Sequence, residues 1–300
     1  MIKRTLYFGN AAYLSTKTEQ LVVNYPDEQK QKTVPIEDVG IVILDHYRIT
    51  ISSGLIHKLL SNNVALITCC DKHLPQGLML NLSEGHTRQE HFAVQINTSE
   101  AFKNKLWKTV IKQKITNQAL VLKENEFEYK NLLYFAKNVQ TGDPQNLEGQ
   151  AAAYYWKRIF SNDIAHFKRG QFEAAPNNLL NYGYTILRAI TARSLVASGL
   201  LPTFGIHHHN KYNAYCLADD IMEAYRPFVD RLVIAIIYDL SEKEMELNTS
   251  IKKELLQIPV LDVMINGKKS PLMVAMQQTS ASLYKSMETK KVNLKLPKME

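Results

Sequence analysis

Three short segments of this chain carry side chains of the types that serve as ligands for divalent metal ions. The first has Glu148 at the start of a predicted helix, the second has three consecutive histidines, and the third has two aspartates and Glu223. Carboxylates suit hard ions such as Mg²⁺, and an imidazole ligand shifts the preference towards Mn²⁺. A divalent ion neutralises a phosphodiester oxygen and stabilises the leaving oxygen. Together, residues 146–156, 205–210 and 217–223 predict metal-assisted chemistry on phosphates.

The first two segments also have ordinary structural explanations. Glu148 would lie in the first turn of a helix, where the helix dipole stabilises a carboxylate without any metal. His207, His208 and His209 follow Gly205 in a predicted loop between helices, where imidazoles can simply be exposed. At most one or two of the three can face a common point, so a metal cage made of these histidines alone is not expected.

The third segment offers two carboxylates on one face of a predicted helix. Asp220 and Glu223 are three residues apart and share that face, while Asp219 points elsewhere. Two like charges on one face are destabilising unless a cation lies beside them, and a divalent ion would supply one. Arg226, three residues after Glu223, is the alternative, because it would form an ordinary surface ion pair. The residues alone leave both explanations open.

Two parts of the chain must position these residues, and the first is β-rich. Short runs of β-branched residues separated by turn-forming residues predict strands, and one apolar stripe predicts a short helix. We expect a small N-terminal domain of antiparallel strands over residues 1–83. Its strands are expected at 21–23, 39–44, 64–68 and 76–80, and its helix at 53–60.

The second part is helical. From residue 87 onwards, apolar residues recur at the spacing of an amphipathic helix. We therefore predict an α+β protein in which a larger, all-α catalytic domain, residues 84–300, follows the β-rich domain. Its helices are expected at 148–160, 177–199, 216–240, 245–259 and 272–290, with a loop at 141–144.

The charge balance favours polyanionic partners. The chain has 36 Lys and Arg residues against 29 Asp and Glu residues, and its net charge is +7. Two lysine-rich stretches predict either a solvated helix face and a loose tail, or contacts to the phosphates of a nucleic acid. They comprise Lys103, Lys105, Lys108, Lys112, Lys114 and Lys123, and Lys285, Lys290, Lys291, Lys295 and Lys298.

The cysteines indicate a reducing compartment. Cys69, Cys70 and Cys216 are odd in number and lack a Cys-x-x-Cys spacing, so neither a disulfide framework nor a structural zinc site is expected. The N-terminus is too short and polar to be a signal peptide, and the most apolar run, 232–238, is far too short to span a bilayer. We expect a cytoplasmic protein with no membrane partner.

Four motifs in order resemble those of a known family. They are Glu148-Gly149-x-Ala-Ala, the run from Asn178 to Tyr184, Gly205-Ile206-His207-His208, and the run from Asp220 to Pro227. In this order and spacing they are similar to the CRISPR-associated spacer-acquisition integrase, the metal-dependent DNA endonuclease of CRISPR adaptation modules. The resemblance covers nearly the whole chain and is greatest to integrases of type II systems.

The resemblance assigns roles to particular residues. The catalytic, metal-binding set of the family falls on Glu148, His208 and Glu223, with the histidine three residues after the motif glycine. Asp220, the first member of the Asp-x-x-Glu pair, is expected to support a ligand rather than to bind the metal. The metal implied is Mg²⁺ or Mn²⁺. Gly183, in the second motif, is expected to let a neighbouring helix approach.

The resemblance also implies substrates and partners. The substrate would be a short duplex of foreign DNA whose 3′-hydroxyl ends attack the CRISPR repeat beside its leader. The protein would form a homodimer through its N-terminal domain, and two dimers would join the smaller CRISPR adaptation protein in a heterohexamer. Two alternatives remain at this point: a metal-dependent nuclease that degrades nucleic acid without integration, and a non-enzymatic DNA-binding scaffold.

Overall fold

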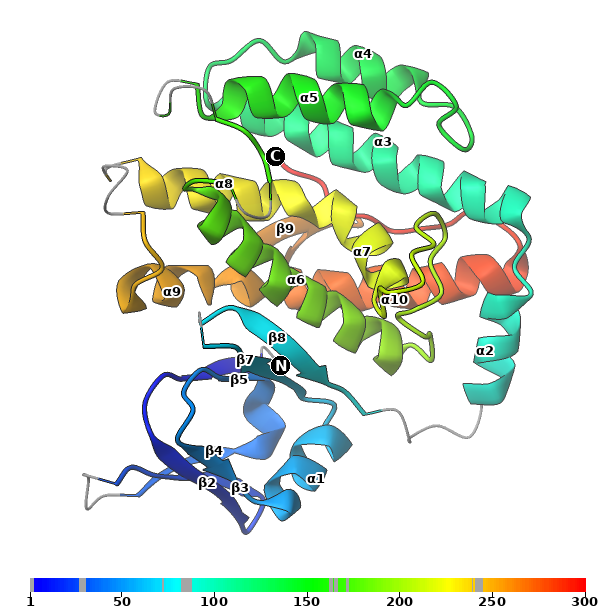
Figure 1. Cartoon of the computed structure of the whole chain (residues 1–300). Coiled ribbons are helices and arrows are strands. Elements are labelled where there is room, and N and C mark those ends of the chain that lie inside the picture. Colours follow the sequence, from blue (N-terminus) through cyan, green and yellow to red (C-terminus); the bar gives the residue numbers. More distant parts are fainter. Residues whose placement is uncertain are drawn as a thin grey trace. The chain divides into compact units, whose positions relative to one another are not determined.

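The protein is α+β, as predicted, and consists of two compact units. The computed structural model describes residues 3–26, 31–71, 73–81, 88–161, 164, 167–170, 173–238, 240 and 245–300. Its units are Met1–Arg88 and Gln89–Glu300 (Figure 1). The domain boundary predicted after residue 83 falls within 82–87, outside the described residues.

Two four-stranded sheets and one helix build the first unit. One sheet has the strand order β1-β5-β7-β8 and the other has the order β4-β3-β2-β6. Ser52 caps the helix α1, because its side chain accepts a hydrogen bond from the Leu55 amide. The elements are β1 (Arg4–Phe8), β2 (Ala12–Lys17), β3 (Gln20–Asn24), β4 (Lys32–Pro35), β5 (Val39–Leu44), β6 (Ile49–Ile51), α1 (Ser53–Ser61), β7 (Ala65–Cys69) and β8 (Pro75–Met79).

The expectation of antiparallel strands is wrong for much of this unit. β5 pairs in parallel with both β1 and β7, and β2 pairs in parallel with β6. After β5 the chain passes through β6 and α1 before it enters β7, and such a crossover returns the chain to the same end of the sheet. The continuous apolar run of β5, buried over Val39–Ile43, is typical of a parallel strand covered on both faces.

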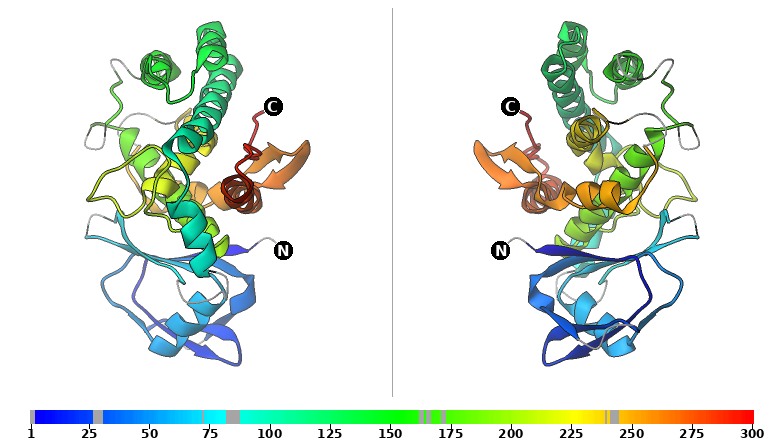
Figure 2. Two further views of the ribbon diagram at one scale, coloured as in Figure 1. Left: turned by 90° about the vertical axis from the view of Figure 1, so that its right-hand side faces the viewer. Right: turned by 90° about the vertical axis from the view of Figure 1, so that its left-hand side faces the viewer.

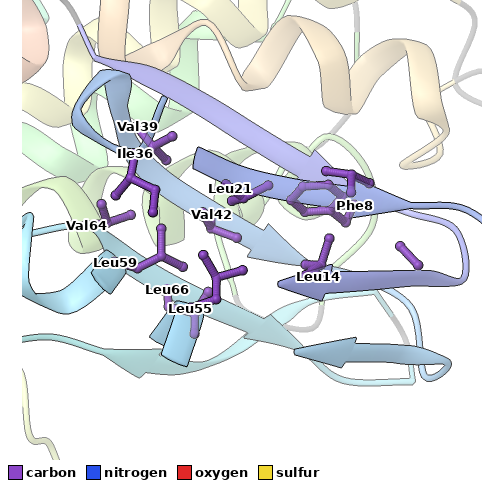
Figure 3. Packing of buried hydrophobic residues seen from close by; sticks show 12 residues of the cluster. Phe8, Leu14, Leu21, Ile36, Val39, Val42, Leu55, Leu59, Val64 and Leu66 are labelled. Atoms are coloured by element: carbon purple, nitrogen blue, oxygen red, sulfur yellow. The ribbon is translucent and has the colours of Figure 1, made fainter. Parts of the chain in front are cut away.

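Apolar side chains from both sheets and from α1 form the core of this unit (Figure 3). Leu14 and Leu21 come from one sheet, Val42 from the other, and Leu55 and Leu59 from the helix; all five are 2% exposed or less. Each buried side chain of this size contributes roughly 1.5–3 kcal/mol to folding relative to an exposed one. The unit thus has a hydrophobic core of its own.

Helices dominate the second unit, and the longest, α3, is central to the site. α4 and α5 pack along α3 (Figure 1). Serine and asparagine side chains cap several helix starts, such as Ser99 for α3 and Asn248 for α9. The helices are α2 (Arg88–Ile96), α3 (Glu100–Glu124), α4 (Lys130–Asn138), α5 (Leu147–Ile159), α6 (Asn177–Ala197), α7 (Cys216–Met222), α8 (Arg226–Ile237), α9 (Thr249–Leu255) and α10 (Leu272–Thr289).

This unit is not all-α, because a β-hairpin precedes α10. β9 (Asp262–Ile265) and β10 (Lys268–Pro271) pair antiparallel and lie next to α10 (Figure 2). Their two-residue turn is Asn266-Gly267, and both residues have a positive φ. Asn-Gly is the residue pair that such a turn requires, so the sequence carried a signal for this hairpin.

The lysine-rich tail is not loose. The backbone of Lys298 exchanges two hydrogen bonds with that of Met264 in β9, at 2.7 and 3.1 Å. The buried Asn117 of α3 donates to the Pro297 carbonyl and accepts from the Met299 amide. Buried Leu296 and Met299 complete the attachment. The C-terminus is therefore packed onto the second unit.

The helix predicted over 216–240 is not continuous, because it is interrupted at a residue of the candidate site. α7 ends at Met222, a 3₁₀ turn covers Glu223–Tyr225, and α8 begins at Arg226. Pro227 lies in the first turn of α8, where its missing N–H is tolerated, but it cannot continue a helix from before. Glu223 consequently lies in a 3₁₀ turn, which is tighter than the α-helix that its three-residue spacing from Asp220 predicted.

Gly183 allows α6 and α8 to pack closely, as predicted. A Cβ added there would come within 2.7 Å of Val229 Cγ1 and 3.3 Å of Ile258 Cδ1. Gly183→Ala should therefore destabilise the second unit by roughly 1–3 kcal/mol, measured by chemical denaturation. Gly54→Ala is the control, because its Cβ would meet only Thr16 Cγ2 at 3.8 Å. An unchanged unfolding midpoint for Gly183→Ala would contradict the packing argument.

Candidate metal and nucleic-acid site

Glu148 lies in a tightly fixed first turn of α5. Asp143 accepts hydrogen bonds from the backbone amides of Leu147 and Glu148, both at 2.9 Å, and the Asn146 side chain accepts from the Gly149 amide. Three orphan amides of the helix start are thus satisfied. The Glu148 side chain is 30% exposed and does not serve in this capping, so its carboxylate is available for other partners.

Asp220 fixes the loop that carries the histidines. Its side chain is fully buried, and its carboxylate accepts the backbone amides of Ile206, His207 and His208 at 2.7, 2.9 and 3.2 Å. It also lies 2.5 Å from Nδ1 of His208. Gly205 makes this possible, since a Cβ there would come within 2.4 Å of the His208 carbonyl oxygen and 2.8 Å of Asp220 Oδ2. Asp220 therefore orients the His208 ring.

The three histidines have different surroundings. His207 stacks flat on Trp107 of α3, with ring centroids 4.2 Å apart and an interplanar angle of 4°. His208 meets the same indole edge-on at 5.6 Å, and its side chain is half exposed. His209 is exposed. With Nδ1 directed at Asp220, the His208 ring has its Nε2 atom left for a ligand, as in carboxylate–histidine–metal arrangements.

The pKa values of His207 and His208 are shifted in opposite directions. The hydrogen bond to Asp220 raises the pKa of His208, although burial opposes this change. Burial lowers the pKa of His207, and the neighbouring His208 lowers it further. Glu223 contributes to the raised pKa of His208, and Glu148 acts on His207 in the same direction. The histidine loop therefore lies within electrostatic reach of both glutamates.

Lys114 joins the two glutamates. Its Nζ forms ion pairs with Glu148 Oε1 and with Glu223 Oε2, the second at 2.7 Å. The Lys114 side chain is only 9% exposed, so this lysine does not lie on a solvated face, and its ammonium is held by the two glutamates. In this respect the interpretation of the lysine-rich stretch was wrong. Among its other members, Lys105, Lys112 and Lys123 are exposed.

Glu223 is a buried carboxylate between two cations. Besides Lys114, Arg226 lies beside it, with Nε 3.0 Å from Oε1. Burial raises the pKa of Glu223, but Arg226 and Lys114 outweigh burial, and the pKa stays below its usual value. Only 8% of the side chain is exposed, so this is not the ordinary surface pair that the three-residue spacing suggested. The site holds Glu223 ionised.

Asp219 does not share the partners of Asp220 and Glu223, in agreement with the prediction that it points elsewhere. Its carboxylate accepts from Arg188 Nε at 2.6 Å and Nη2 at 3.1 Å, and from the Asn213 side chain at 2.7 Å. The fork of Arg188 is matched by both carboxylate oxygens. This pair ties α6 to α7 and fixes the direction in which Asp220, the next residue, faces.

A cavity lined by three arginines lies beside Glu223. It has a volume of about 270 Å³ and polar walls, and Arg169, Arg188 and Arg226 project into it. Planar guanidinium groups match the geometry of phosphate oxygens. Only Arg226 among these three was singled out from the sequence, because Arg169 and Arg188 are far apart along the chain and carry no motif. The remaining lining residues are Asn181, Tyr184, Thr185 and Met222.

A buried polar cluster connects the helices that carry the site. Asp230 of α8 accepts hydrogen bonds from Tyr184 of α6 at 2.5 Å and from Tyr155 of α5 at 3.1 Å. Burial raises the pKa of Asp230 to about 6, against the effect of these two hydroxyl donors. The guanidinium of Arg226 lies over the Tyr184 ring, 4.7 Å from its centroid. The cluster thus joins α5, which carries Glu148, to the arginine beside Glu223.

The donor set fits a divalent ion, but the side chains do not form a metal cage as they stand. Within the described ranges, no three His, Cys, Asp or Glu side chains converge closely enough to hold a metal. Two carboxylates nevertheless meet at one cation, the Lys114 ammonium, and an oriented imidazole lies nearby. Two carboxylates and one imidazole suit Mg²⁺ or Mn²⁺. Glu148, Glu223 and His208 would be the ligands.

Asp220→Asn should release the histidine loop and lower the pKa of His208. An amide has one acceptor oxygen where the carboxylate has two, and its NH₂ group would face the backbone amides of the loop. A raised His208 pKa keeps the ring protonated to a higher pH, so metal binding by wild-type protein should weaken as pH falls through that pKa. The variant should shift this dependence to lower pH.

Proton NMR of the His208 ring and Mn²⁺ binding at several pH values measure both effects of Asp220→Asn. Asp262→Asn is the control, because it makes the same change at an exposed carboxylate whose ion-pair partner is Lys269 of the β-hairpin. An unchanged His208 pKa in Asp220→Asn would contradict the orienting role of Asp220.

The site of the second unit combines carboxylate, imidazole and guanidinium side chains, a set that is typical of enzymes that act on nucleic acids. Residues 6–257 match the family model described as CRISPR associated protein Cas1. The match covers well over half of the chain. The chain therefore belongs to the Cas1 family of CRISPR-associated proteins.

Individual relatives agree with this membership. The CRISPR-associated endonuclease Cas1 of Neisseria meningitidis serogroup C (strain 8013) is 33% identical over 100% of this chain and 97% of its own length. A CRISPR-associated endonuclease Cas1 of Francisella tularensis subsp. novicida (strain U112) is 26% identical over 87% of this chain and 88% of its own. The predicted resemblance to this family of CRISPR-associated proteins is therefore confirmed.

Solved structures share the fold. A casposase bound to integration product superposes with a TM-score of 0.77 at 21% identity, covering 98% of this chain and 92% of its own. A Cas1 protein from Thermotoga maritima gives a TM-score of 0.75 at 16% identity, covering 97% of this chain and 99% of its own. At these identities the likeness establishes the fold only.

Over the described stretches of the chain, no helix has both the length and the apolar character to cross a membrane.

Proposed function

We propose that this protein is a metal-dependent DNA endonuclease and integrase that inserts short foreign DNA fragments into a CRISPR array. The observation that carries the proposal is the meeting of Glu148 and Glu223 at one cation, beside an oriented His208 and an arginine-lined cavity. A site with carboxylates and an imidazole binds a metal, and guanidinium groups alongside bind phosphates. A non-enzymatic DNA-binding scaffold would need the guanidinium groups that bind phosphates but not the carboxylates and imidazole that bind a metal.

The proposed reaction is transesterification. The oxygen of a fragment's 3′-hydroxyl attacks a phosphorus atom at the edge of the first repeat, beside the leader. A new P–O bond forms, the bond from that phosphorus to the 3′-oxygen of the nucleotide flanking the repeat breaks, and the proton of the attacking hydroxyl ends on the departing oxygen through solvent. No oxidant and no covalent protein intermediate are required.

Each side chain has a role in this scheme. Glu148, His208 and Glu223 would hold Mg²⁺ or Mn²⁺, and such an ion would neutralise a non-bridging phosphate oxygen and activate the attacking hydroxyl. Asp220 keeps the His208 ring in one orientation. Arg169 and Arg188, which line the neighbouring cavity, would contact phosphates of the strand that passes the glutamates. The exposed lysines add sequence-independent, salt-sensitive affinity for DNA.

We also propose an assembly and a location. The first unit would form a homodimer, and two dimers would join the smaller CRISPR adaptation protein in a heterohexamer in the cytoplasm. A structural neighbour supports the association with a second protein, because a Cas6-RT-Cas1–Cas2 complex matches 98% of this chain with a TM-score of 0.75, over 36% of its own chain. Native mass spectrometry of the protein alone and with its small partner tests the stoichiometry.

An in vitro joining assay tests the activity. A labelled short duplex with 3′-hydroxyl ends is incubated with a plasmid that carries leader and repeats, with Mg²⁺ or Mn²⁺ or with a chelator. Metal-dependent joined product is expected at the repeat edge, and a duplex with 3′-dideoxy ends should give none. Cut plasmid without joined product would favour a degrading nuclease. DNA binding that ignores chelator, with no product in any metal, would favour a scaffold.

A further inference from the structure

Lys114 occupies the position between the two carboxylates that the proposed metal would need. Its Nζ pairs with both Glu148 and Glu223, and its side chain is 9% exposed. Trp107, 2% exposed, and the fully buried Ile111 lie two turns and one turn before it on the same helix. The ammonium is therefore held in the site rather than sampling solvent.

The charges of this cluster already balance. Glu148 and Glu223 carry two negative charges, and Lys114 and Arg226 carry two positive charges, all within paired distance. A divalent ion added to this set would leave two net positive charges in a largely buried place. Burying uncompensated charge is strongly unfavourable, because the surroundings solvate it poorly. An ion can therefore bind well only if an existing cation leaves or new negative charge arrives.

Lys114 is the cation that can leave. Arg226 is held on two sides, since its guanidinium also lies over the Tyr184 ring, which in turn donates to Asp230. Lys114 reaches the glutamates on a flexible four-carbon chain and has no ion-pair partner besides them among the described residues. Its ammonium and a metal ion would use the same carboxylate oxygens.

We propose that Lys114 competes with the divalent ion for Glu148 and Glu223 and so keeps the site weakly metal-binding until a phosphate of the DNA arrives. The phosphate supplies the missing negative charge and gives the displaced ammonium a new partner. Metal binding and DNA binding thereby become mutually dependent, as any coupling between two ligands must be reciprocal. This inference rests on the metal-dependent function proposed above.

Binding of Mn²⁺ to the full-length protein tests the inference without an activity measurement. Lys114→Met retains the length and apolar stem of lysine but removes its charge. Without DNA, the variant should bind Mn²⁺ at least about ten-fold more tightly than wild type, because a like charge at ion-pair distance has been removed. Lys112→Met, an exposed position on the same helix, makes the same charge change and should leave the affinity unchanged. Electron paramagnetic resonance of free Mn²⁺ gives the affinities.

Two further measurements keep the test decisive. Lys114→Gln retains two hydrogen-bond donors to the glutamates, and should show the same tightening if Lys114→Met is too unstable to purify. In wild type, a short DNA duplex should tighten Mn²⁺ binding, and in the Lys114 variants this gain should be smaller. Equal Mn²⁺ affinities for wild type and both variants would overturn the competition while leaving the metal function intact. No Mn²⁺ binding by any protein, with or without DNA, would overturn both.

Discussion

Glu148→Gln protein will lose strand transfer by on the order of 10³-fold while its stability changes little. Glutamine has the shape of glutamate, but its amide is a far weaker ligand for a divalent ion. The Glu148 carboxylate is 30% exposed, and the start of α5 is capped by Asp143 and Asn146 rather than by Glu148 itself. The substitution therefore removes the charge from the site without removing support from the helix.

Glu223→Gln will lose strand transfer to a similar extent but will also unfold more easily. Glu223 is 8% exposed and neutralises both Lys114 and Arg226. Removing one partner from a buried ion pair typically costs about 3–5 kcal/mol, because the remaining charge stays uncompensated. The two glutamates should thus be alike in the joining assay and unlike in chemical denaturation.

A control and a contrary result make this pair of variants informative. Glu124→Gln makes the same charge change in a partly exposed ion pair, in which Arg231 Nη1 lies 3.3 Å from Glu124 Oε1. This control variant should retain joining. Near-normal joining by both Glu148→Gln and Glu223→Gln would contradict the site assignment. Loss of joining by Glu124→Gln as well would mean that the assay responds to overall charge rather than to the site.

Local signals in the sequence predicted much of the fold but not the pairing within it. Apolar periodicity predicted α5 and α6 to within a few residues, since each has a regular buried face. β1, β5 and β7 pair in parallel because of the route that the chain takes between these strands. The residue types within the strands do not indicate that route. The hairpin at Asn266-Gly267 did carry a local signal, because Asn-Gly is a residue pair that favours a two-residue hairpin turn.

Lys114 shows why part of the site could not be predicted. On α3 it stands among five other lysines, so its sequence environment is that of a basic surface. Its burial follows from the packing of α5 and of the turn at Glu223 against α3, and Glu148 is 34 residues away along the chain. Asp220 differs, because it belongs to a recognisable motif, and the motif alone predicts that it supports a ligand.

His208→Ala will reduce joining by on the order of 10²–10³-fold, and His207→Ala and His209→Ala will have much smaller effects. Because the three histidines are consecutive, their residue type does not distinguish them. Their surroundings in the structure do. Of these three histidines, only His208 has a ring nitrogen directed at a buried carboxylate, with Asp220 Oδ1 2.5 Å away. That contact holds the ring in one tautomer and leaves Nε2 as the atom that would bind the proposed metal.

The neighbouring substitutions have their own expected results. His207→Ala removes the flat stack on Trp107, which should cost about 1 kcal/mol of stability and leave Mn²⁺ affinity nearly unchanged. His209 is exposed, so its replacement should alter neither quantity. Joining assays, denaturation and Mn²⁺ binding on the three variants measure each effect separately. If His207→Ala loses metal and joining while His208→Ala retains them, the ligand is His207, and the carboxylate of Asp220 serves only to hold the loop.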